Sequence, residues 1–184
     1  MKKQLRWMWI VLFLVGCGAS VSRVAIKPST TGLARGSRVS IVVTGIQAVA
    51  LTEEEREFLG KETVSRLVET GKFADVHLRS NISEGDHPDY VVRCEVSRLF
   101  RVSRGRRLVA GLLGGGSDPA MVEVNVTILA GSGQRVMIAG ALISGKSSWG
   151  WSLFAGYGMF AGTTEQAFQK VAEGIATFAS EQVR

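Results

Sequence analysis

The sequence contains few residues of the types that build disulfide scaffolds or metal sites. Its 184 residues include two cysteines and two histidines. Cys17 lies in a distinctive N-terminal segment, so Cys94 alone remains for the folded part, and one thiol cannot form an internal disulfide. The fold must therefore rest on its hydrophobic core. His77 and His87 have no cysteine or carboxylate cluster at ligand spacing, so we expect no metal site and no cofactor.

Long hydrophobic runs are also absent. The apolar run at residues 7–15 has nine members, far short of the roughly 20 residues that a membrane-spanning helix needs. It follows a basic start that contains Lys2, Lys3 and Arg6 and no acidic residue, and small residues come after it. This order is typical of a secretory signal peptide. The sequence therefore predicts export rather than a membrane span.

The export segment ends in Leu-Val-Gly at positions 14–16, followed by Cys17. These four residues resemble the bacterial lipobox. The resemblance implies cleavage before Cys17 and attachment of diacylglycerol to its thiol. Several buried acyl chains make such an anchor effectively permanent. Gly18 stands where the family places an aspartate for inner-membrane retention, which favours the outer membrane with the domain facing the periplasm.

We expect three regions: a signal peptide at residues 1–16, a lipidated flexible tether at 17–37, and a single domain at 38–184. The tether is rich in Ser, Thr, Gly and Arg and carries Pro28, a composition that suits a flexible leash. Residues 24–26 could form a short strand within it. Removing the signal peptide lowers Lys plus Arg from 22 to 19 against 16 acids, so the formal charge falls from +6 to +3. In this compartment the basic balance does not indicate a nucleic-acid partner.

Periodicity predicts an α+β fold for the domain. Strands are expected at residues 39–46, 73–78, 89–97, 122–128 and 135–145, and amphipathic helices at 52–70 and 163–182. Thr52 with Glu55, and Thr163 with Gln166, have the spacing of helix capping boxes. Apolar residues alternate with polar ones from Tyr90 and again from Val122, as in half-buried strands. The prediction is a mixed five-stranded sheet of order βαββββα, its last three strands an antiparallel meander, packed with two helices.

This order, the lipobox and several glycine-rich stretches resemble an uncharacterised bacterial lipoprotein family, domain of unknown function 4410. The stretches are residues 108–116, the turn at 131–133 and the segment after Gly145. The family pattern often has an acidic residue before the turn, where this chain has Leu129 and Ala130. The architecture is also similar to periplasmic domains of curli-secretion lipoproteins and to the N-terminal domain of TolB. These resemblances imply work in envelope assembly, but a fold does not establish a function.

Residues 140–147 match the spacing of a phosphate-binding P-loop, G-x-x-x-x-G-K-S. Such a loop works only where it leaves a strand and starts a helix whose amides hold phosphate. Here the four intervening residues continue a strand, so we expect no nucleotide site. The glycines at 111–116 join two antiparallel strands and are expected to form a hairpin connection.

Two segments invite a functional hypothesis. One is aromatic and interleaved with glycine, and the other is basic and apolar. The candidate interaction residues are Trp149, Trp151, Phe154, Tyr157 and Phe160 in the first segment and Arg104, Arg106 and Arg107 in the second. If the last three strands form a meander, both segments emerge at the same end of the sheet. The aromatic segment could cap the core, form an interface with an envelope protein or a second copy, or contact a lipid surface.

No catalytic constellation is evident, and we expect a non-enzymatic protein that acts by binding or assembly. One alternative is an envelope hydrolase, which would need Asp86, His87 and Asp89 to converge in a pocket. A second alternative is a small-ligand or lipid carrier, which would need a deep apolar cavity between sheet and helices. Cys94 falls in an alternating apolar run and is expected to be a small buried hydrophobe.

Overall fold

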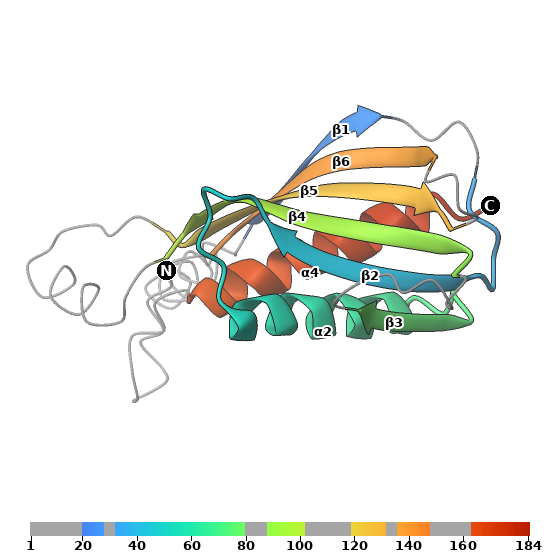
Figure 1. Cartoon of the computed structure of the whole chain (residues 1–184), viewed down its shortest axis with the longest axis horizontal. Coiled ribbons are helices and arrows are strands. Elements are labelled where there is room, and N and C mark those ends of the chain that lie inside the picture. Colours follow the sequence, from blue (N-terminus) through green and yellow to red (C-terminus); the bar gives the residue numbers. More distant parts are fainter. Residues whose placement is uncertain (1–19, 28–31, 80–87, 102–118, 132–135, 148–162) are drawn as a thin grey trace, which may run out of the picture.

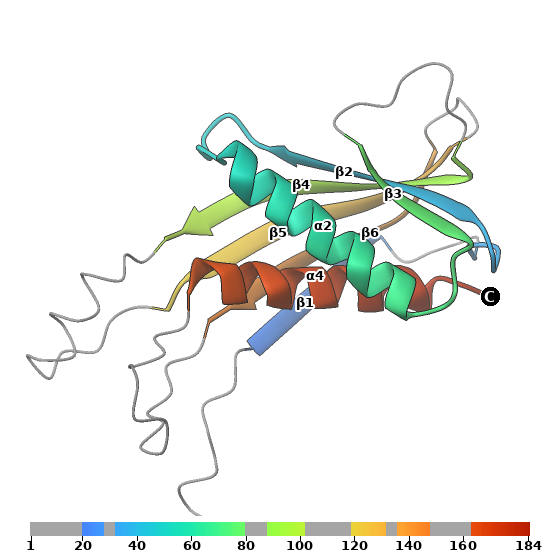
Figure 2. The same ribbon diagram turned by 90° about the horizontal axis from the view of Figure 1, so that it is seen from below.

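The computed structural model describes residues 20–27, 32–79, 88–101, 119–131, 136–147 and 163–184. Six strands form one sheet, and two helices lie across the same face of it (Figures 1 and 2). In chain order the elements are β1 Ser20–Lys27, β2 Arg38–Gly45, α2 Glu53–Glu69, β3 Asp75–Arg79, β4 Tyr90–Phe100, β5 Met121–Ala130, β6 Met137–Lys146 and α4 Thr164–Glu181. Neither described helix is long and apolar enough to cross a membrane.

The sheet has the order β1-β6-β5-β4-β2-β3. Strands β2 and β3 pair in parallel, and helix α2 connects them, as the sequence predicts. Strand β4 adds to the other side of β2, also in parallel. The predicted antiparallel meander of β4, β5 and β6 is confirmed. Strands and helices thus form a mixed α+β architecture with two layers.

The predicted number of five strands is wrong, because β1 adds a sixth. The predicted tether at residues 17–37 is wrong over residues 20–27, because the short strand considered at 24–26 is part of a longer one that pairs antiparallel with β6. Residues 32–37 also belong to the domain, where Leu33 is buried and its backbone exchanges hydrogen bonds with Gln182 and Arg184 near the C-terminus. In β1 every side chain from Ser20 to Ile26 is exposed, so the strand lacks the buried alternation that identifies β4 and β5. Its pairing partner lies more than a hundred residues away, where local composition cannot reveal it.

Side-chain contacts also fasten β1 to the helix layer. The Arg23 guanidinium forms an ion pair with Glu181 at the end of α4. The same guanidinium carbon lies 5.8 Å from the centre of the Phe178 ring, within the range of a cation–π attraction. At the last residue of the strand, Lys27 Nζ donates a hydrogen bond of 2.6 Å to the Met137 carbonyl. Strand β1 is therefore held to the domain by contacts beyond its backbone pairing.

The core lies between the sheet and the helices. Alternate residues of β4 and β5, such as Val92, Cys94 and Val124, point into it and are fully or almost fully buried. Helix α4 contributes Phe168, whose ring meets that of Phe58 from α2 edge to face, with centroids 6.4 Å apart. Such pairs add to the burial of apolar area, which is the main term favouring folding.

Replacing Phe168 with alanine should lower the free energy of unfolding by about 3–5 kcal/mol, because a fully buried aromatic ring leaves a cavity. Phe100 is the matched control, since it is 45% exposed and its replacement should cost less than about 1 kcal/mol. Urea denaturation followed by circular dichroism measures both changes. Equal destabilisation by the two variants would contradict the described core.

Candidate functional site at one end of the sheet

The candidate residues predicted from the sequence lie outside the part of the chain that the structure describes. They are Cys17, Arg104, Arg106, Arg107, Trp149, Trp151, Phe154, Tyr157 and Phe160. The structure instead places the residues that flank these segments. Arg101 and Pro119 flank the basic segment, and Ser147 and Thr163 flank the aromatic one.

Strand residues next to three of these flanks lie in one row that continues into β1. Phe100 at the end of β4 pairs with Met121 at the start of β5, and Met121 pairs with Lys146 at the end of β6. Lys146 pairs in turn with Ser20, the first residue of β1. Figure 2 shows these four strand ends at the same end of the sheet. The prediction that both segments leave the sheet at one end is confirmed for their points of attachment.

Hydrogen bonds hold this end of the meander together. The Ala120 amide donates to Ser147 Oγ at 3.0 Å, and the Ser147 amide donates to the Ala120 carbonyl at 2.9 Å. Both residues are buried, and buried polar groups that are satisfied in this way add rigidity. The bonds fix where the chain enters β5 and where it leaves β6.

Arg101 joins the end of β4 to the start of α2. Its Nε and Nη2 donate to the two oxygens of Glu55 at 2.6 and 2.5 Å, and Nη2 also donates to the Ala50 carbonyl. Glu55 completes the predicted capping box, accepting from the Thr52 amide at 3.0 Å while its own amide donates to Thr52 Oγ1 at 3.2 Å. The hydrogen bonds from Arg101 lower the pKa of the Glu55 carboxyl below its ordinary value of 4.5, although burial opposes the shift.

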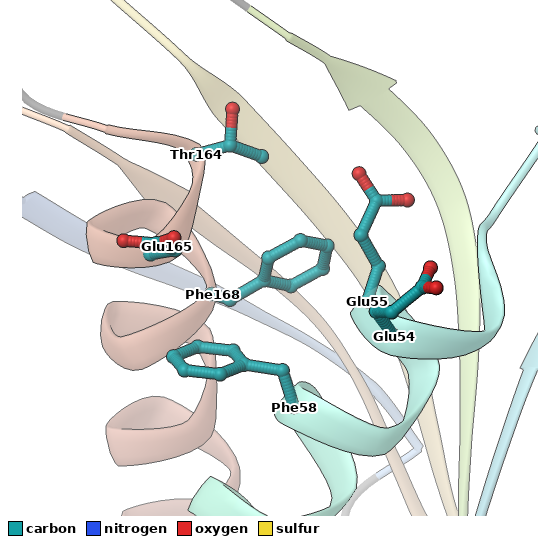
Figure 3. A pocket seen from close by; sticks show the side chains of 6 residues that line it. All are labelled: Glu54, Glu55, Phe58, Thr164, Glu165 and Phe168. Carbon is teal, nitrogen blue, oxygen red and sulfur yellow. The ribbon is translucent and has the colours of Figure 1, made fainter.

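A pocket of about 250 Å³ opens between the first turns of the two helices. Figure 3 shows the rings of Phe58 and Phe168 side by side, with the carboxylates of Glu54 and Glu55 on α2 and of Glu165 on α4 around them. Acidic residues at the first turn of a helix offset its positive dipole end. At α4 the Gln166 amide also donates to Thr163 Oγ1, half of the capping box predicted there. Helix capping therefore accounts for the acids, and the described residues contain no group of three or more His, Cys, Asp or Glu that could hold a metal ion.

Other candidate groups have structural roles. Cys94 is buried as predicted, and burial raises the pKa of its thiol to about 12, so it stays protonated and unreactive at neutral pH. Of the trio proposed for a hydrolase, only Asp89 is described, and it accepts from the Arg38 amide at 2.7 Å. Residues 140–146, which match the P-loop spacing, lie within strand β6. The expectation that they continue a strand is confirmed.

No protein-family model matches the chain, and no curated protein matches its sequence. Two solved dodecamers of PelC from Paraburkholderia phytofirmans are similar, with TM-scores of 0.53 and 0.51 at 17% identity; each match covers 90% of this chain and 98% or more of PelC. The Chlamydia trachomatis protein CT253 is similar with a TM-score of 0.50 at 13% identity, over 79% of this chain and 97% of that one. At these identities the likeness shows the fold alone.

The Arg101–Glu55 pair should make the stability of the protein depend on pH. Glu55→Gln should lower the free energy of unfolding by up to about 1 kcal/mol at neutral pH, since the pair is part-exposed. A carboxylate whose pKa falls on folding stabilises the protein above its ordinary pKa, and this contribution disappears as the pH drops through the lowered value. The difference between the two proteins should therefore shrink below about pH 5.

The control for this series is Glu57→Gln on the same helix, whose 2.7 Å ion pair with Lys61 is exposed at both ends. The urea midpoint of this variant should stay close to that of the wild type throughout the pH range. Urea midpoints measured across the range test both variants. A Glu55→Gln deficit that persists undiminished at about pH 3 would mean that the ionised pair is not its source.

Proposed function

We propose that this chain is a lipoprotein of the bacterial envelope, anchored through Cys17, whose domain acts by assembly with other protein rather than by catalysis. The anchor rests on the sequence of the export segment. The assembly role rests on the geometry of the domain, in particular on the open edge of the sheet at β1. The proposed location is the outer membrane, with the domain facing the periplasm.

The edge at β1 is the observation that carries the assembly role. One side of β1 pairs with β6, while no other described strand pairs with its outer side. Val24 and Ile26 on this strand are 62% and 59% exposed. An exposed apolar edge with free backbone donors and acceptors is a template for pairing with another chain. The irregularity between Ala25 and Lys27 leaves the first six residues of the strand as the regular part of that template.

A second copy of this chain is the partner that we favour. The PelC structures that share this fold are dodecamers, which supports a homo-oligomer built on the same architecture. Repeated contact between different edges of identical subunits generates rings when the rotation closes. The sheet has two different edges, β1 and β3, so a head-to-tail arrangement is available to it.

The alternatives have less support in the described residues. Asp89 of the proposed hydrolase trio binds the start of β2, where it serves the fold. A lipid carrier needs a deep apolar cavity, whereas large side chains such as Ile41, Ile128 and Ile175 are fully buried in the core between sheet and helices. The resemblance to domain of unknown function 4410 stays a prediction.

The assembly role is tested by placing charge on the edge. Replacing both Val24 and Ile26 with lysine should convert the detergent-extracted oligomer into a monomer, because edge lysines block strand pairing. Val68→Lys is the matched control, since Val68 is 57% exposed and lies on α2 rather than on the β1 edge. Light scattering coupled to size exclusion gives the masses. A wild-type monomer, or a double variant that stays oligomeric, would contradict the proposal.

The anchor is tested separately by intact mass. Protein extracted from the membrane fraction should have the mass of a chain that begins at Cys17 and carries three acyl groups. The Cys17→Ser variant should lose that mass increment and leave the membrane fraction, because a non-acylated chain has no lipid to bury. A wild-type chain of unmodified mass would overturn the lipoprotein assignment.

A further inference from the structure

The distance between the lipid site and the sheet is short. Only Gly18 and Ala19 separate Cys17 from Ser20, the first residue of β1. Three peptide units span at most roughly 10 Å when fully extended. Because β1 is part of the sheet rather than a tether, this reach is the full separation available between the acylated cysteine and the folded domain. Ser20 must therefore lie close to the bilayer surface.

The strand register extends this closeness to the bilayer from Ser20 to the neighbouring strands. Ser20, Lys146, Met121 and Phe100 occupy one row, each paired with the next. Neighbouring strands are about 4.8 Å apart, so the row extends sideways by only roughly 15 Å from Ser20. The strands run away from this row, and β5 with its ten residues is roughly 30 Å long. One end of the sheet is thus held near the lipid and the other can stand well clear of it.

The side chains of this row suit a membrane interface. Phe100 is a large hydrophobe and yet 45% exposed. Lys146, which lies in the row between Ser20 and Met121, is also exposed. Aromatic rings and long cationic side chains favour the boundary between headgroups and acyl chains. The Arg101 guanidinium at this end is paired with the Glu55 carboxylate. Contact should therefore depend on the tether and on the side chains of the row.

We propose that the end of the sheet formed by Ser20, Phe100, Met121 and Lys146 lies against the bilayer that holds Cys17, with the strands directed away from it. This inference rests on the proposed lipid anchor and adds the face that touches lipid. The basic and aromatic segments predicted as an interaction surface are attached at this same end. The opposite end, near Val136, then faces the periplasm.

The two ends of β6 provide a matched pair of reporter positions. Lys146 is exposed at the membrane end, and Val136, one residue before the strand, is 53% exposed at the other end. Each is replaced with cysteine in the full acylated chain and labelled with an environment-sensitive fluorophore through a maleimide. Cys94 is fully buried and Cys17 is blocked by lipid, so the label goes to the introduced thiol.

The labelled proteins are reconstituted into vesicles of phosphatidylethanolamine and phosphatidylglycerol that contain lipids with a nitroxide on the headgroup. A nitroxide quenches only at close range, so the label at position 146 should lose most of its fluorescence while the label at 136 keeps it. The same Lys146→Cys label on a Cys17→Ser chain should lose its quenching, because the tether that holds this end near the lipid is gone.

The outcomes separate the two claims. Equal quenching at both positions, or stronger quenching at 136, would overturn the orientation while leaving the anchor intact. Absence of quenching at both positions in a chain of verified triacyl mass would do the same. An unmodified mass would instead remove the anchor, and the orientation with it. Quenching at 146 alone in the acylated protein supports both.

Discussion

The antiparallel pairing of β1 with β6 is the contact on which the account of this protein depends. It extends the meander by one strand, and the ion pair of Arg23 with Glu181 ties that strand to α4 as well. Without it, the chain before Gly32 would be a leash, and the domain could stand at any angle to the proposed lipid. With it, Ser20 lies within roughly 10 Å of the proposed anchor at Cys17.

The same pairing links orientation to assembly. If the strands rise from the bilayer, the exposed edge at β1 rises with them, and so does the edge at β3 on the other side of the sheet. Edges that stand upright on a common surface can meet only side by side in the plane of the membrane. The proposed anchoring would also concentrate the copies in two dimensions and so raise their effective concentration. Both effects would favour lateral association through edges over stacking of faces.

Much of the fold could be predicted from the sequence, because its signals are local. Strands β4 and β5 alternate between core and outer face, and the pair Thr52 and Glu55 identified the start of α2 at a spacing of three residues. The meander followed from short-range order, and with it the common end of the two attached segments. These features depend on neighbours in the chain, which is what periodicity detects.

The features that the sequence did not reveal depend on distant partners. The sequence suggested at most a short strand at residues 24–26, because β1 has no buried face, and nothing local indicated its full length or its pairing with β6. Arg101 was one of several arginines in its neighbourhood, and only the fold brings it to Glu55 across 46 positions. The pocket between Phe58 and Phe168 likewise joins two helices that are distant in sequence.

The central claim is that residues 20–27 are a strand of the domain, and hydrogen exchange of their amides tests it most directly. In the membrane-extracted protein, amides of β1 that bond to β6 should exchange slowly, in an alternating pattern along the strand. In an assembled form that pairs through this edge, the remaining amides should be protected as well. Uniformly fast exchange over residues 20–27, as in a free leash, would contradict the pairing with β6 and the orientation built on it.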